Sequence, residues 1–191
     1  MISDLLSYEI SDFIMYSKEA LGGFLSTYNK HIWPTQLVWV FVSIVIFYIL
    51  VMKNQLTKLV LIFFSAAWFF TGWYFYKDHF SSINLASHYA FYLCAAQGAI
   101  ILGFALLPSI RLNKNLLALS VLFVCFFVPF EWIFKDELLE VTLFGWGPLP
   151  VSIASLALIG LIIGLKIKLL LLSIIPSLIL CFALASHFYA Q

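Results

Sequence analysis

Six long runs of apolar residues constrain the fold more than any other feature of this sequence. They cover residues 35–52, 58–76, 85–107, 115–134, 148–165 and 169–190. A helix crosses the hydrocarbon core of a bilayer with about 20 residues, in a range of about 17–25, at 1.5 Å per residue. The runs therefore predict an all-α membrane bundle of six transmembrane helices. The fifth run reaches this length only if part of residues 141–150 enters the membrane or caps the helix at its surface.

The composition agrees with a membrane protein. Of the 191 residues, 64% are hydrophobic and 10% are charged, whereas soluble domains carry about 25% charged residues. A water-soluble core of this length cannot hide so much apolar surface, so lipid is the expected solvent and the bilayer the expected partner. The net charge of +1 and the lack of a basic cluster argue against nucleic-acid binding.

The links between the runs are short, which makes sequential helices antiparallel neighbours in one domain, residues 28–191. Residues 1–27 differ in character. Apolar residues recur there at roughly helical spacing, with charged residues between them. This pattern predicts an N-terminal amphipathic helix on the membrane surface, which Gly22-Gly23 would end or break.

The basic residues divide unevenly between the two sides of a six-span bundle. One side holds Lys53, Lys58, Arg111, Lys114, Lys166 and Lys168, all in short loops. The other side holds Lys18, Lys30, Lys77 and Lys135. By the positive-inside rule the first side faces the cytoplasm. We therefore expect a multi-pass protein of the cell inner membrane with both termini outside the cytoplasm.

Polar and aromatic residues gather on the outer side. All four histidines lie on or near it, and so do five of the six tryptophans. Because an aromatic belt normally appears at both interfaces, this asymmetry predicts a site in the outer third of the bundle. The alternative is an outer aromatic belt beside solvated loops.

The candidate residues for an outward-facing polar pocket are Asn29, Gln36, Asn84, His88, Gln97, Glu131 and Trp146. Glu131 is a carboxylate inside a predicted span, and such groups are functional candidates because they are expensive in lipid. Its alternative role is an ion pair with Lys135, four residues later on the same helix.

Asn84 and His88 are four residues apart and are predicted to share one face of the third helix. We expect both to meet Glu131 in the pocket, with Gln97 deeper, near the bilayer midplane. The alternative role of Gln97 is to hold helices together. For His88, a metal or haem ligand and a hydrogen-bonded structural histidine are the open alternatives.

Asn29 and Gln36 flank the start of the first span, where they either wall the cavity or belong to an interfacial anchor. Trp146 lies in a break of the chain, residues 145–150. Irregular backbone at membrane depth is tolerated only when it is packed in protein or faces water, so this break either turns the chain or lines the site. Pro176 is expected to kink the sixth helix.

Signatures of catalysis and metal binding are absent from the sequence. It contains no HExxH, GxSxG, Walker A or GxGxxG motif. The three cysteines lie inside apolar runs without metal-ligand spacing, as small hydrophobic side chains do. We therefore expect no catalytic residue, no metal site and no cofactor.

Several short motifs, in this order, resemble a family of small bacterial multi-pass integral membrane proteins known only as a domain of unknown function. They are Tyr28-Asn29, Trp33-Pro34-x-Gln36, Ile83-Asn84, Gln97, Phe144-Gly145, Pro148-x-Pro150 and Ile175-Pro176. The resemblance covers residues 28–191 and implies a membrane bundle without implying an activity. That family often has Tyr-His where this chain has Phe75-Tyr76, and Cys where it has Leu149, which argues against a shared thiol or histidine chemistry.

The leading functional hypothesis is a non-enzymatic bundle that binds or passes a small molecule through the outward-facing pocket, or supports a membrane-protein partner. One alternative is a membrane-embedded enzyme or redox subunit that uses the outer histidines for a metal or haem. A second alternative is a purely structural membrane partner whose polar residues hold helices together.

Overall fold

The computed structural model describes residues 16–52, 57–107, 111–112, 115–128, 141–163 and 166–189. In chain order the elements are α2 (Lys18–Ile32), α3 (Gln36–Met52), α4 (Thr57–Phe70), the π-helix η3 (Thr71–His79), the 3-10 helix η4 (Phe80–Ser82), α5 (Ser87–Ala105), β1 (Arg111–Leu112), α6 (Leu116–Phe127), α7 (Pro148–Leu161), β2 (Ile162–Ile163) and α8 (Lys166–Tyr189). A helix occupies each of the six predicted runs, and the all-helical class of the fold is confirmed.

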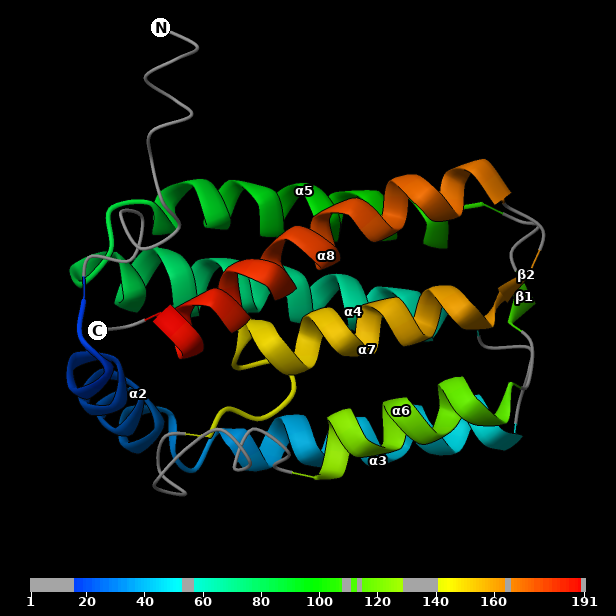
Figure 1. Ribbon diagram of the computed structural model, residues 1–191. Helices are drawn as coiled ribbons and strands as arrows, with labels where there is room; N and C mark the ends of the chain where they lie inside the picture. Colours follow the sequence, from blue (N-terminus) through cyan, green and yellow to red (C-terminus); the bar gives the residue numbers. More distant parts are fainter. Residues whose placement is uncertain are drawn as a thin grey trace, which may run out of the picture.

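Helices α3 to α8 form an elongated bundle, with α2 at one end and the short β1–β2 pair at the other (Figure 1). Helix α4 packs against α5, α7 packs against both α6 and α8, and α3 lies against α4 and α6. At the far end Leu112 pairs with Ile162 in antiparallel register. At the α2 end the hydroxyl of Tyr16 donates a hydrogen bond to Ser186 Oγ at 2.7 Å, so the two ends of the described chain meet there.

Capping residues and prolines explain where several helices begin. At the start of α2, Ser17 Oγ accepts a hydrogen bond from the backbone N–H of Ala20 at 3.2 Å. At the start of α6, Asn115 Oδ1 accepts from the backbone N–H of Leu117 at 3.0 Å. Helix α7 begins at Pro148, where the missing N–H of proline costs the helix nothing.

Helix α2 corrects one prediction from the sequence. It continues through Gly22-Gly23, where a break was expected, and bends by 78° into α3 at residues 33–35. A glycine costs a helix about 1 kcal/mol, and the burial of Leu21, Leu25 and Tyr28 against the bundle offsets that cost. Residues 1–15 of the predicted surface helix lie outside the described residues.

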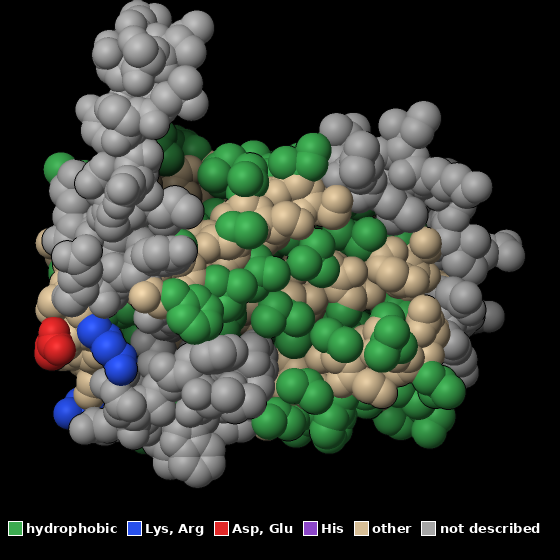
Figure 2. Space-filling model, in the orientation of Figure 1, with side chains coloured by type: hydrophobic (Ala, Val, Ile, Leu, Met, Phe, Trp, Pro, Cys, Tyr) green, Lys and Arg blue, Asp and Glu red, His purple; other side chains and the backbone are tan. Residues whose placement is uncertain are grey.

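The outside of the bundle is apolar. Large hydrophobic side chains are exposed on α3, α4, α5, α6 and α8, among them Phe41, Leu59, Leu102, Phe123 and Leu178. On the face shown in Figure 2, the charged side chains of described residues gather at the α2 end. Soluble monomers rarely expose apolar surface on this scale, so lipid is the solvent that this surface fits.

Two described helices are long and apolar enough to cross a membrane, Thr57–Ser82 and Ser87–Ala105. The bent pair of α2 and α3 adds a third if it forms one span. Among the described residues, three further helices are apolar but shorter: Leu116–Phe127, Pro148–Leu161 and Leu172–Ser186. These helices support association with a membrane.

Candidate functional site

A buried hydrogen-bond network fastens α2 to the segment before α7. The hydroxyl of Tyr28 donates to the Trp146 carbonyl at 2.8 Å, and Asn29 Nδ2 donates to the Val141 carbonyl at 2.9 Å. Gln36 Nε2 donates in turn to Asn29 Oδ1 at 3.1 Å. The structure thus brings together Asn29, Gln36 and Trp146, three of the predicted pocket residues. Their side chains are buried against protein, which gives them an anchoring role here.

The break predicted at residues 145–150 is shorter in the structure, because α7 begins at Pro148, and it makes a tight turn inside the bundle. Gly145 has φ +85°, and a Cβ there would lie 2.6 Å from the Trp39 ring, so glycine is required. Its carbonyl accepts a hydrogen bond from Thr71 Oγ1 at 3.2 Å. The Trp146 ring packs edge-on against Phe70, with centroids 4.4 Å apart. Of the two alternatives from the sequence, a chain turn or a site lining, these contacts support the turn.

An open groove of about 300 Å³ lies between α2 and the end of η3. We call it the histidine groove; it is lined by Phe24, Thr27, Tyr28, His31, Asp78, His79 and Ser82. The rings of His31 and His79 face each other with centroids 5.6 Å apart. Tyr28 supplies an aromatic floor, edge-on to His79 at 5.2 Å. The groove is therefore a solvent-accessible site at the α2 end of the molecule, with polar groups on a partly aromatic lining, and none of the predicted pocket residues lines it.

Local hydrogen bonds make this groove rich in acceptors. His79 Nδ1 lies 2.8 Å from the Tyr74 carbonyl. Because a carbonyl only accepts, Nδ1 carries the proton, and Nε2 of the neutral ring is left as an acceptor. The Ser82 hydroxyl donates to the His79 carbonyl at 2.7 Å, so its oxygen also faces outward as an acceptor. With the carboxylate of Asp78, the groove offers several acceptors to one ligand.

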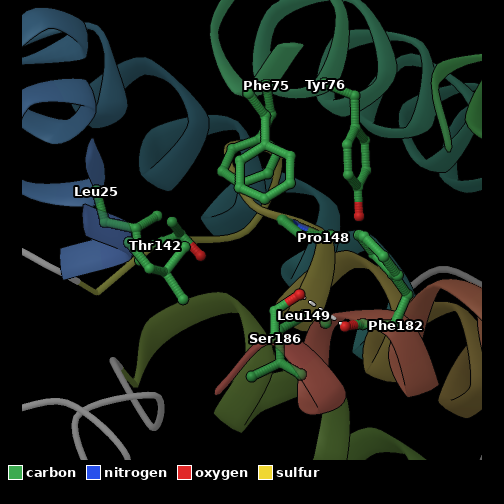
Figure 3. Close-up of a pocket in the computed structure, with 11 residues that line it drawn as sticks. Leu25, Phe75, Tyr76, Thr142, Pro148, Leu149, Phe182 and Ser186 are labelled. Atoms are coloured by element: carbon green, nitrogen blue, oxygen red, sulfur yellow. Dashed lines mark hydrogen bonds between the residues drawn. The ribbon is translucent and has the colours of Figure 1, made fainter. Parts of the chain in front are cut away.

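A much smaller cavity, of about 30 Å³, lies beneath α2 (Figure 3). Leu21 and Leu25 of α2 line it, opposite Leu149 at the start of α7 and Phe182 of α8. It has room for about two water molecules.

An aromatic partition separates this cavity from the histidine groove. Phe24 lines the groove, and its ring lies 5.8 Å from Phe75 and 5.4 Å from Phe80, which both line the cavity.

Buried polar groups converge beside the cavity. Tyr76 is 1% exposed, its hydroxyl points into the cavity in Figure 3, and it has no hydrogen-bond partner among the described residues. Asn84 Oδ1 accepts from the backbone N–H of Ala86 at 2.8 Å, while its Nδ2 finds no partner in that same part of the chain. Burial raises the pKa of the nearby Tyr16, and its hydrogen bond to Ser186 partly opposes the shift.

Asn84 and His88 differ in burial, so the pocket that they were expected to share stays a prediction. Asn84 is buried, whereas His88 is exposed. The reason is that helix α5 begins only at Ser87, so the helical spacing assumed between the two residues does not exist.

Gln97 is buried in the bundle and has a structural partner. Its Nε2 donates to the Leu172 carbonyl at 3.1 Å. That carbonyl lies four residues before Pro176, which has no N–H to offer it within α8. Gln97 therefore replaces the hydrogen bond that the proline removes. This bears out the interhelical role that the sequence left as an alternative.

Glu131 lies outside the described residues, as does the side chain of His187, so the expected meeting of His88 with Glu131 stays a prediction. In the described chain no group of three or more His, Cys, Asp or Glu side chains could hold a metal ion.

The pairing of His31 with His79 was missed in the sequence, although both had been placed on the outer side. Their approach depends on the course of α2 through Gly22-Gly23, which brings His31 beside the end of η3. Comparison with protein-family models, curated proteins and solved structures finds no match to the chain. The resemblance to the uncharacterised membrane family therefore remains a prediction.

Proposed function

We propose that this chain is a six-span membrane protein that binds a small organic amine in the histidine groove. The observation that carries the proposal is the open groove of about 300 Å³, which combines a carboxylate, further acceptors and an aromatic floor. Pockets for small ligands are concave, partly apolar and equipped with a few convergent polar groups, and the groove has each of these properties.

The chemistry of the groove favours a cation that carries an apolar stem. The Asp78 carboxylate, the Ser82 oxygen and His79 Nε2 all accept hydrogen bonds, so a ligand with N–H donors satisfies them. The rings of Phe24 and Tyr28 offer apolar faces to the stem and attract positive charge.

The membrane arrangement in this proposal has α3 to α8 crossing the inner membrane, with both termini and the groove outside the cytoplasm. Two features support it. The exposed surface of the helices is apolar, and the hydrogen bond between Tyr16 and Ser186 joins the two ends of the described chain on one side, as an even number of crossings requires. The distribution of lysines supports the orientation.

Binding of butylammonium, compared with neutral 1-butanol, tests the proposal. We expect ligand-observed NMR on the purified protein in detergent to show tighter binding of the cation. The Asp78→Asn variant should lose about 10- to 100-fold in butylammonium affinity, because a hydrogen bond to a charged group contributes about 1.5–3 kcal/mol. Its affinity for 1-butanol should change little.

Glu19→Gln is the matched control, since Glu19 is a fully exposed carboxylate of α2 outside the groove. It should leave both affinities unchanged. Equal binding of the two probes to the natural protein, or an equal loss in the Asp78 and Glu19 variants, would overturn the proposal.

A further inference from the structure

We propose that a second surface, on the other side of η3, binds the phosphate headgroup of an anionic phospholipid. This headgroup patch consists of Trp73 and Lys77 on η3 and of Phe91 and Tyr92 on α5, which ring and cation contacts connect, together with Tyr89, one turn before Tyr92 on the same helix. It is distinct from the histidine groove, with which it shares no residue.

The lysine of the patch is held in place by aromatic rings. Lys77 Nζ lies 3.5 Å from the centroid of the Trp73 ring and 5.4 Å from that of Phe91. Trp73 and Phe91 contact each other edge-on, with centroids 5.9 Å apart. A cation over an aromatic face keeps its remaining N–H donors free for an anion.

The patch lies at the level where lipid headgroups are expected. Tyr89 and Tyr92 belong to the first two turns of α5, within about 8 Å of its start at Ser87 along the helix axis. They are 75% and 66% exposed, and Trp73 is 53% exposed. Tyrosine and tryptophan with an apolar body and a polar tip favour the membrane interface, where a phenol can donate to a lipid oxygen.

Charge selects the type of lipid. Among the described residues no ion pair joins Lys77 to a carboxylate, and the neighbouring Asp78 lines the histidine groove. The Trp73 face is occupied by the Lys77 ammonium and cannot also take the quaternary ammonium of a choline headgroup. An anionic headgroup such as that of phosphatidylglycerol therefore fits the patch better than a zwitterionic one.

Lipid retention tests this inference. The full chain would be reconstituted in vesicles of equal phosphatidylglycerol and phosphatidylcholine, extracted, and analysed for bound lipids by native mass spectrometry. We expect the natural protein to retain phosphatidylglycerol preferentially. The Lys77→Gln variant should lose about fivefold in that preference, since one lysine near an anionic surface contributes about 1 kcal/mol.

Lys58→Gln is the control, because Lys58 is an exposed lysine at the opposite end of the α4–η3 helix. It should keep the preference, and so should Lys77→Arg, which retains the charge. If Lys77→Gln does not fold, loss of the preference in the folded Trp73→Leu variant tests the same patch. The inference would be overturned if Lys77→Gln, or Trp73→Leu where it replaces that variant, kept the preference unchanged. It would also be overturned if Lys58→Gln lost the preference equally.

Discussion

At the residue scale, the clearest physical pairing is between Gln97 and the carbonyl that Pro176 leaves open. Gln97→Leu removes the donor to the Leu172 carbonyl and should lower the free energy of unfolding by about 1–2 kcal/mol. In a Pro176→Ala background the cost should be smaller, because the new backbone N–H at position 176 can bond to Leu172 within α8. Unfolding in sodium dodecyl sulfate of the two single variants and the double variant measures this coupling. Equal costs of Gln97→Leu in both backgrounds would contradict the pairing.

A second residue-scale prediction concerns Gly145. Gly145→Ala should destabilise the protein by about 1–3 kcal/mol, because φ +85° is strained for alanine and the new Cβ meets Trp39 at 2.6 Å. Gly103→Ala is the control: Gly103 lies in α5 with open space around it, so alanine should be neutral or stabilise by up to about 1 kcal/mol. Thermal unfolding monitored by circular dichroism compares them. Similar midpoints for the two variants would argue against the tight turn.

At the element scale, the docking of α2 should weaken at high pH. Burial raises the pKa of Tyr16 above 10.0, its ordinary value. Below pH 10 the phenol is protonated whether docked or not, and its hydrogen bond to Ser186 stabilises the fold. Above pH 10 the undocked phenol ionises first, so the undocked state binds fewer protons and is favoured. Tyr16→Phe should therefore lower the unfolding midpoint at pH 8 and cost less, or nothing, at pH 11. An equal cost at both pH values would contradict this role of Tyr16.

The sequence predicted the positions of the bundle helices well because each long apolar run forms one helix, while only two or three of the described helices are long and apolar enough to cross a membrane. The predicted run 35–52 corresponds to Gln36–Met52, and 85–107 to Ser87–Ala105. The prediction for α2 failed at Gly22-Gly23. The free-energy cost of two glycines in a helix can be read from the sequence, whereas the burial of Leu25 and Tyr28, which offsets it, cannot. The candidate site failed in part for the same reason. Side chains at one depth could be grouped from the sequence, but which of them share a face depends on where each helix begins.

At the scale of the whole molecule, the two proposed binding sites lie at one end of the bundle, and much of its exposed surface is apolar. The histidine groove and the headgroup patch both lie at the α2 end, and the exposed sides of α3 to α6 are apolar. This arrangement connects the two proposals physically, since a small amine would approach the groove from water while the patch holds the same end at the lipid surface. The internal network of Tyr28, Asn29 and Gln36 fixes the end of the bundle on which both depend.

The last prediction is the course of the chain through the membrane. Single cysteines would be introduced in a Cys181→Ser background, because Cys181 is an exposed native thiol while Cys94 and Cys125 are buried. The exposed positions to test are Lys30, Ser82 and Val128, expected outside the cytoplasm, and Lys58 and Asn115, expected inside.

A membrane-impermeant maleimide should label the first three variants in intact cells and the other two only after the membrane is opened. If two successive positions lie on opposite sides, the chain between them crosses the membrane an odd number of times. Alternating sides along these positions therefore support four separate spans: α3, α4 together with η3, α5, and α6. The hydrogen bond between Tyr16 and Ser186 places the end of α8 on the same side as the start of α2. If α7 crosses the membrane inward, α8 must therefore cross it back outward. Labelling of the Lys58→Cys variant from outside would reverse the orientation or remove the first span. Labelling of both the Ser82→Cys and Asn115→Cys variants from the same side would show that α5 does not cross.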